Sequence, residues 1–399
     1  MRHHIWTRTC VGVVALSLLG AACSQDDGAT VRDLGAADGS AIDSSGSGSA
    51  SAIASGSASG SAGAVASGTA SSPGTGAERA SVEADGDYEY ASDVAVQRLL
   101  TEDVCDIREL LDAEPVDWAA IETVYREGEH AVADDGSVRT LAGFATSEDA
   151  LHGLAEVQGS PTPLDDWMTE ALDGAGRFAG TSDRERAEAV EKGAQNQILV
   201  AWTVHELRAA LADAAAGDLD ATAGAPHLWD EAWAFYHGAA PDCAPFSTAT
   251  ARAGDFGTLA ADGRTAVANE AIIADMEAGR EALLDGDAEA ARDAVDEVLR
   301  ELVVTYSQAA IRYATLVQED VAAGDQEAAA EHRVEGLAFF RVMEALVADA
   351  GADVAAVEAV FDLDAELGTT GGGDDVRAAL EPAWDELGIT AADIGTLDT

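Results

Sequence analysis

The sequence contains almost no lysine. Basic residues number 22 against 74 acidic ones in a chain of 399 residues, and Lys192 is the single lysine. A net charge of −52 offers no basic patch to a phosphate backbone, which excludes nucleic-acid binding. Acidic, lysine-poor surfaces stay hydrated in concentrated salt, where repulsion between like charges is screened. The charge therefore indicates adaptation to high salt, with a cation store or a basic partner as the alternative.

Several catalytic and nucleotide-binding motifs are also absent. The sequence has no glycine-rich phosphate loop, no nucleophile elbow and no Cys-x-x-Cys pair. The segment "HELRA" (205–209) begins like the helix of a zinc protease, but Ala209 stands where the second histidine would be. An enzyme, such as a di-metal carboxylate oxidase or a hydrolase, is therefore a lesser alternative.

Cysteine is scarce, and two of the four cysteines belong to a targeting signal. "MRHHIWTR" is basic, and "VGVVALSLLGAA" is an apolar run too short for a membrane span. Small residues precede Cys23, so residues 1–22 are predicted to be a lipoprotein signal peptide that leaves a lipid on Cys23. Three residues before Cys23, Gly20 stands where a lipoprotein signal has a branched apolar residue. The alternatives are cleavage as an ordinary signal peptide or an uncleaved anchor.

The other two cysteines, Cys105 and Cys243, lie in the body of the chain. An exported protein with two remaining cysteines can form one disulfide. We therefore predict a bridge between them, with two free buried thiols as the alternative.

The chain divides by composition into a tether and a helical domain. Residues 23–86 are rich in Ser, Gly and Ala, cannot bury a core and are predicted to form a flexible tether. Residues 87–399 repeat apolar positions at helical spacing, proline is sparse, and no β-hairpin signal is convincing. We predict an all-α antiparallel bundle. Its expected helices are 90–113, 115–133, 146–157, 183–216, 226–237, 262–285, 287–323, 326–349, 351–361 and 373–387.

Two stretches of this domain echo each other. Residues 201–218 lead to "HLWDEAWAFY" (227–236), and residues 307–325 lead to "EHRVEGLAFF" (331–340). Each is a long helix, a Gly-Asp turn and a helix carrying Glu-x-x-Ala-Phe-aromatic. The pattern suggests a duplicated helical hairpin, although chance similarity in an alanine-rich chain is the alternative.

Histidines and glutamates on apolar helix faces are the candidate ligands. His227 lies four residues before Glu231, and His332 lies three before Glu335, so each pair shares a face. An ionised carboxylate on an apolar stripe needs a partner. Bundles bind iron, manganese or zinc through such inward pairs. The predicted metal ligands are His227, Glu231, His332, Glu335, His205 and Glu206.

The alternative is a buried ion-pair network without a metal. In that interpretation Arg312 or Arg341 neutralises Glu231 or Glu335, and the histidines are satisfied core groups. His130 and His152 have weaker context and are interpreted as structural or surface residues. The tryptophans and phenylalanines of these helices are interpreted as core anchors.

A family resemblance joins these segments. The segments are "DWAAIETVYREGEHA" (117–131), "EKGAQNQILVAWTVHELRAAL" (191–211), "HLWDEAWAFYHG" (227–238), "ARAGDFGT" (251–258), "VANEAIIADMEAGREAL" (267–283) and "YSQAAIRYA" (306–314). Their most specific parts are Trp-Asp-Glu-x-Trp-x-x-Tyr-x-Gly and the following Phe-Gly-Thr. Their order resembles the low-iron-inducible periplasmic proteins, the Fea1-type iron-assimilating proteins of algae and their prokaryotic relatives. The resemblance spans most of residues 115–345 and implies an exported helical protein of iron acquisition, without an established ligand set.

Together these observations predict a lipoprotein tethered to the cell surface through Cys23. It binds iron, or a similar hard metal ion, outside the cell, and hands it to an unidentified transporter partner. An imelysin-like iron-uptake domain, suggested by His332-x-x-Glu335, and a structural helical lipoprotein with no metal ligand are the alternatives.

Overall fold

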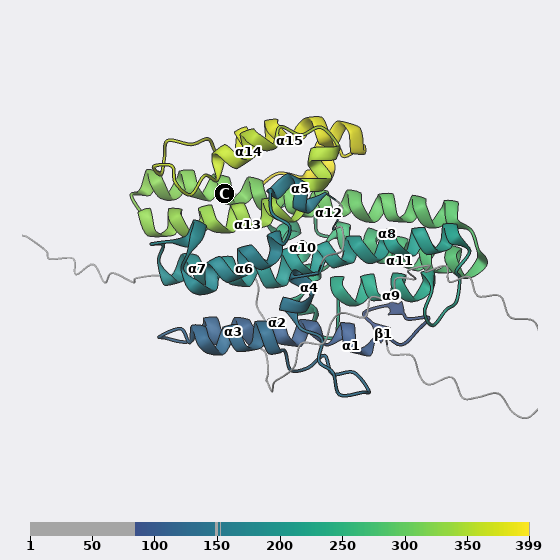
Figure 1. Ribbon diagram of the computed structural model, residues 1–399. Coiled ribbons are helices and arrows are strands. Elements are labelled where there is room, and N and C mark those ends of the chain that lie inside the picture. The colour runs from purple at the N-terminus through teal and green to yellow at the C-terminus, as the bar shows by residue number, and fades with distance from the viewer. Residues whose placement is uncertain (1–83, 148–150, 152, 399) are drawn as a thin grey trace, which may run out of the picture.

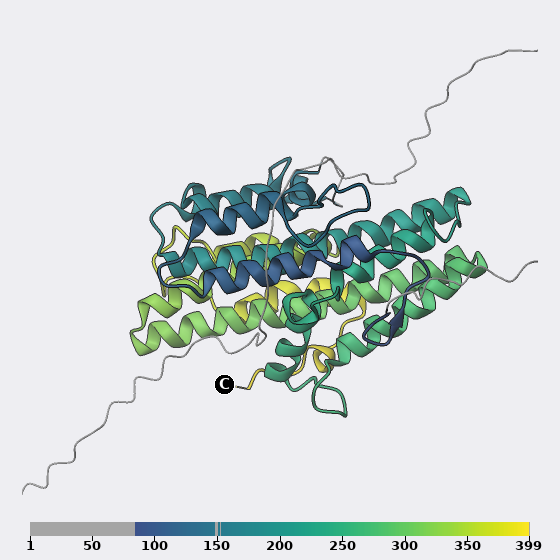
Figure 2. The ribbon, with the colours of Figure 1, turned by 90° about the horizontal axis from the view of Figure 1, so that it is seen from below.

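The computed structural model describes residues 84–147, 151 and 153–398, which form a helical bundle (Figures 1 and 2). The predicted all-α fold is confirmed. Within this part of the chain, strands are limited to a short antiparallel pair, β1 (Ala84–Asp85) and β2 (Tyr88–Glu89), and to isolated bridges. The predicted signal peptide, Cys23 and nearly all of the predicted tether lie outside the described residues.

The helices follow one another with short connections. In chain order they are α1 (Ala95–Arg98), α2 (Leu100–Leu111), α3 (Trp118–Glu127), α4 (Leu141–Ala145), α5 (Leu154–Gln158), α6 (Pro163–Asp173), η1 (Gly176–Phe178), α7 (Asp183–Lys192), the π-helical η2 (Gly193–Ile198), α8 (Leu199–Ala216), α9 (Ala225–Tyr236), η3 (Pro241–Cys243), α10 (Pro245–Phe256), α11 (Val267–Asp285), α12 (Ala288–Ala323), α13 (Gln326–Asp349), α14 (Val354–Val360), α15 (Gly373–Leu387) and α16 (Ala391–Ile394).

Gly-Asp pairs separate the longest helices, as the sequence predicts. Gly286 and Gly324 adopt left-handed backbone angles that end α11 and α12, which glycine does without a Cβ clash. The aspartates that follow each accept the amide of the third residue of the next helix. Glycine stop and aspartate cap therefore set both turns.

Within the described residues, four α-helices fall outside the expected ranges, namely α4, α6, α10 and α16, and the expected helix 115–133 is shorter. Two of the four, α6 and α10, begin on a proline, Pro163 and Pro245. Proline suits the first turn of a helix, where its missing N–H has no partner anyway. The predicted helix 115–133 instead ends at Glu127, because Gly128 turns the backbone to a φ of 59°.

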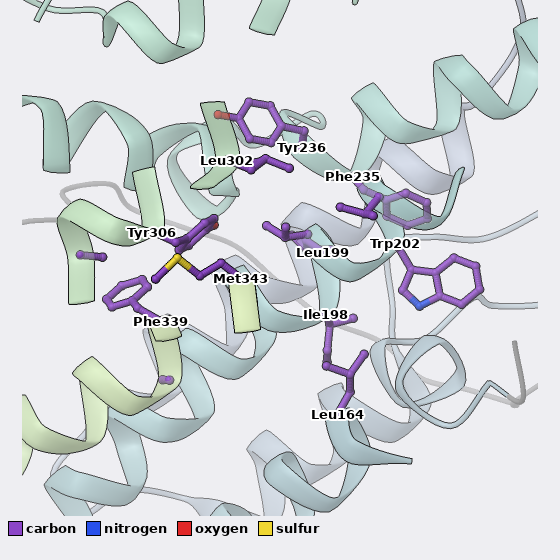
Figure 3. Close-up of a cluster of buried hydrophobic side chains, with 14 of the residues drawn as sticks. Leu164, Ile198, Leu199, Trp202, Phe235, Tyr236, Leu302, Tyr306, Phe339 and Met343 are labelled. Carbon is purple, nitrogen blue, oxygen red and sulfur yellow. The ribbon is translucent and has the colours of Figure 1, made fainter. Parts of the chain in front are cut away.

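The core lies where α6, η2, α8, α9, α12 and α13 converge (Figure 3). Trp202, Phe235 and Phe339 are buried there, as the sequence predicts. The ring of Phe144 on α4 meets Trp202 and Phe235 edge to face, with centroids 4.8 and 5.1 Å away. The indole N–H of Trp202 donates to the carbonyl of Phe144, so this large anchor leaves no polar atom unpaired.

The predicted disulfide is present between Cys105 on α2 and Cys243 at the end of η3. It connects positions 138 residues apart in sequence and so links α2 to the segment that follows α9. No helix within the described residues has the length and apolar character needed to cross a membrane.

Candidate metal centre

Two aspartates of α2 and a histidine from the loop after α3 lie close together on one side of α2. Asp103 and Asp106 are three residues apart, so they share one face of α2. Gly128 ends α3 and turns the chain back, which brings His130 over that face. One ligand atom from each of the three residues lies within 4.8 Å of the others. Across the described part of the chain, this is the only such group of three or more His, Cys, Asp or Glu side chains.

Hydrogen bonds fix the three side chains. The Oδ1 atom of Asp103 accepts the backbone amides of Glu129 at 3.0 Å and His130 at 3.1 Å. The imidazole Nε2 of His130 lies 2.8 Å from Oδ2 of Asp106. The second oxygen of Asp103, Oδ2, is buried and has no hydrogen-bond partner. The site therefore holds one oriented imidazole and one unused carboxylate oxygen.

Burial governs the electrostatics of this cluster. Asp103 is fully buried and Asp106 is 3% exposed, whereas the His130 side chain keeps 23% of its surface open. Desolvation raises the pKa of Asp103 to about 7, against the lowering effect of the two amides and of His130. A cation entering beside His130 would stabilise the ionised form of Asp103. Oxygen and imidazole donors are the set that iron, manganese and zinc accept.

The surrounding fold holds α2 in place. Cys105 lies between the two aspartates in sequence and is bridged to Cys243. The segment before Cys243 also docks on α1 and α2, because the amide of Ala240 donates to Oγ1 of Thr101 at 2.9 Å. A rigid support of this kind keeps ligands positioned before the ion arrives.

Comparison with known proteins now places the chain. The profile of a family described as low iron-inducible periplasmic protein matches residues 55–399. The chain belongs to this family. The resemblance drawn from the sequence segments is thereby confirmed, and the match covers every described helix. It begins inside the predicted tether, at residue 55. No curated protein and no solved structure shows detectable similarity to the chain.

The predicted pair on α9, His227 and Glu231, forms hydrogen bonds with residues 92–97 near the start of the described chain. Nε2 of His227 lies 3.1 Å from Oε1 of Glu231, which also accepts the amide of Gln97 at 2.5 Å. Nδ1 of His227 lies 2.9 Å from the hydroxyl of Ser92. The adjacent Asp230 accepts the hydroxyl and the amide of Ser92 at 2.8 and 2.7 Å. Apart from the contact between His227 and Glu231, these side chains bind protein groups that lie 134 or more residues away in sequence.

The predicted pair on α13 meets the only lysine of the chain. Nζ of Lys192 lies 3.7 Å from Oε1 of Glu335, 3.5 Å from Oε2 of Glu188 and 3.1 Å from Oε1 of Glu191. Lys192 is 2% exposed. His332 contacts Asp320, with Nδ1 2.6 Å from Oδ2. The ion-pair alternative therefore describes Glu335 well.

The cation beside Glu335 is a lysine, and not Arg312 or Arg341 as the ion-pair alternative predicts. Lys192 neutralises Glu335, whereas Arg341 pairs with Glu344 and Arg312 with Asp255. Desolvation remains the largest influence on Glu335 and raises its pKa despite the lysine.

The six predicted ligands do not form one site. α9 packs on α8 and α11, while α13 packs on α7 and α12 at the other end of the bundle (Figure 1). In the described structure, no three of the side chains of His227, Glu231, His332 and Glu335 bring their ligand atoms within 4.8 Å of one another. On α8, the ring of His205 packs against Trp202 with centroids 4.7 Å apart, and Glu206 is buried.

Sequence reasoning missed the cluster that does converge. The weaker sequence context of His130 indicates a structural or surface residue. The available signal was Asp-x-x-Asp on α2 around Cys105, followed by Gly-Glu-His where α3 ends. Only the fold shows that these two short signals face each other.

Proposed function

We propose that the protein is a lipoprotein, tethered to the cell surface through Cys23, that binds iron or a similar hard metal ion for acquisition. The family supports a role under iron limitation outside the cytoplasm. The proposed ligands are Asp103, Asp106 and His130. The observation that carries this proposal is the buried Oδ2 of Asp103, which has no hydrogen-bond partner beside the two other donors.

The physical argument rests on the cost of buried charge. A carboxylate removed from water is unfavourable unless it is paired or coordinates a metal. Asp103 uses one oxygen for two backbone amides, and the other oxygen gains no such bond. A hard cation with oxygen and imidazole ligands would satisfy it, and would retain open positions toward the exposed edge of His130.

Metal titration of the purified protein in concentrated salt tests the proposal. Mn²⁺ and Fe²⁺ are added without oxygen, and Fe³⁺ is added in air. His130→Ala is compared with His332→Ala, because their side chains have similar exposure, 23% and 25%, and each contacts an aspartate. We expect binding of one ion per chain, weakened about 100-fold by His130→Ala through loss of a ligand.

The matched variant His332→Ala should change the affinity by less than about twofold, since it removes no proposed ligand. If the wild-type protein binds no ion under any of these conditions, the structural-lipoprotein alternative replaces the proposal. That alternative has one observation in its favour, namely that Lys192 lies within 3.7 Å of the carboxylates of Glu188, Glu191 and Glu335.

A further inference from the structure

A cavity of about 440 Å³ lies between α13 and residues 358–364, which form the end of α14 and the loop after it. None of its lining residues belongs to the proposed metal centre. Figure 1 shows α14 lying along α13, and the two helices are in contact. The volume falls within the range of small-molecule sites, roughly 300–1,000 Å³. Its walls combine arginines, acidic residues and an apolar floor.

Arg341 lines this cavity and does not use all of its hydrogen-bond donors. Its Nη1 atom is held by both oxygens of Glu344, a fully buried carboxylate, at 2.5 and 2.6 Å. Its Nη2 atom lies 3.1 Å from Oε1 of Glu358, whose side chain is 41% exposed. Its Nε atom is buried and has no hydrogen-bond partner. Nε and Nη2 together form the fork that grips a carboxylate through two parallel hydrogen bonds.

The remaining walls suit a molecule with charges of both signs. Arg177 of η1 adds a second cation, and Asp362 and Asp364 add acidic groups beyond α14. Leu337, 7% exposed, supplies the accessible apolar surface, and Phe361 is fully buried in the lining. An organic chain could cover that surface while its two ends meet opposite charges.

The cavity wall is preformed. Arg333 is 8% exposed and donates from Nη1 to the carbonyls of Asp362 and Ala365 at 3.0 and 2.7 Å, and from Nη2 to that of Leu363 at 3.1 Å. These bonds fix the segment after Phe361 against α13. A ligand would therefore lose little free energy to ordering this wall.

We propose that this cavity binds a small organic carboxylate that also carries an amino group. The carboxylate takes the Nε and Nη2 edge of Arg341 and displaces Glu358, an exposed partner whose ion pair contributes little. The amino group faces Asp362 and Asp364, and the methylene groups between cover Leu337. This binding requires no metal and stands apart from the proposed iron site.

Calorimetric titration of the purified protein in concentrated sodium chloride tests the cavity. The probes are 5-aminopentanoate, ornithine, succinate and pentanamide. Both amino acids should bind saturably at one site per chain, whereas pentanamide, which lacks both the carboxylate and the amino group, should not bind. Succinate separates the two ends of the argument, because it offers carboxylates without an amino group and should bind at least about tenfold more weakly.

Two variants and a control locate the binding. Glu358→Gln removes the competitor of the ligand and should tighten binding about three- to fivefold. Leu337→Trp fills the cavity and should weaken it at least tenfold, with circular dichroism to confirm that the variant folds. Glu122→Gln is the control, because Glu122 is 42% exposed and pairs with Arg126 outside the cavity.

The proposal is overturned if neither amino acid binds saturably, or if Glu358→Gln fails to tighten their binding. Succinate binding as tightly as the amino acids would contradict the role of the acidic wall. Because Glu358→Gln predicts a gain of affinity, a folding defect in the tryptophan variant leaves the test decisive.

Discussion

Two acidic clusters in this bundle have similar side chains, and burial raises the carboxyl pKa in both, but they differ in the cation that lies beside them. Asp103 and Asp106 meet His130 on one side of α2, and Glu188 and Glu335 lie near His332 where α7 packs on α13. The second cluster contains Lys192, the only lysine in the sequence. Each cluster keeps a buried carboxylate oxygen without a hydrogen bond, Oδ2 of Asp103 in the first and Oε1 of Glu335 in the second. The difference is that a lysine ammonium already lies 3.7 Å from the unbonded oxygen of Glu335, so we propose the external cation at Asp103 and not at Glu335.

The largest effect that sharpens this comparison is expected from Lys192→Met. The substitution leaves Glu188, Glu191 and Glu335 without the ammonium group that lies between them. We expect unfolding free energy to fall by about 3–5 kcal/mol, because removing one partner leaves uncompensated buried charge. Denaturant unfolding in fixed salt measures it, and adding Glu335→Gln should restore part of the loss. A loss below about 1 kcal/mol would show that the cluster does not depend on its lysine.

The next effect concerns Asp103→Asn in the metal-free protein. The pKa of Asp103 is raised from 3.8 to about 7, so between these values the native state binds more protons than the unfolded state. Stability then falls as pH rises toward 7 and stays lowered above it. The amide carries no such penalty and can still accept the two backbone amides through its oxygen. At pH 8 we expect Asp103→Asn to be more stable by about 1–3 kcal/mol.

Unfolding midpoints of Asp103→Asn and the wild type, compared from pH 8 downward, check this sign. The advantage of the variant should shrink as pH falls from 7 toward 4, because Asp103 becomes protonated in the native state. The same variant should lose metal affinity. An advantage that is independent of pH, or absent at pH 8, would mean that Asp103 is not the penalised group.

A smaller and local effect is expected from Asp230→Asn on α9. Asp230 accepts hydrogen bonds from Tyr88, Ala91 and Ser92. Its carboxylate therefore holds residues 88–92 against α9 and needs no metal ion as a partner. We expect a loss of about 1–2 kcal/mol, since an amide cannot replace all of these bonds. Hydrogen exchange should speed up at residues 88–92 before it does so at α12. Uniform acceleration along the chain would argue against a local fastening.

Much of the fold follows from the sequence, because helix formation is read from local patterns. Apolar spacing predicts the long helices, and the Gly-Asp pairs at 286–287 and 324–325 predict their ends. The pattern fails at Pro163 and Pro245, where proline begins a helix instead of separating two. These errors are local, and they leave the all-α class intact.

The candidate site was harder to predict, because it depends on which faces meet. His332 and Glu335 form the expected pair, yet the sequence does not reveal that Lys192, 143 residues before Glu335, lies against it. His130 lies within a segment that carries the family resemblance, but its partners are 24 and 27 residues earlier on another helix. Contacts of this kind are set by packing, which spacing along one helix cannot report.

A crystal structure of the Mn²⁺-soaked protein, with anomalous scattering recorded for the metal, tests the central claim most directly. The account predicts one strong peak at about 2.0–2.3 Å from a carboxylate oxygen of Asp103, one of Asp106 and an imidazole nitrogen of His130. It predicts no peak beside Lys192. A peak among Glu188, Glu191 and Glu335, or between His227 and Glu231 with none at Asp103, would contradict it.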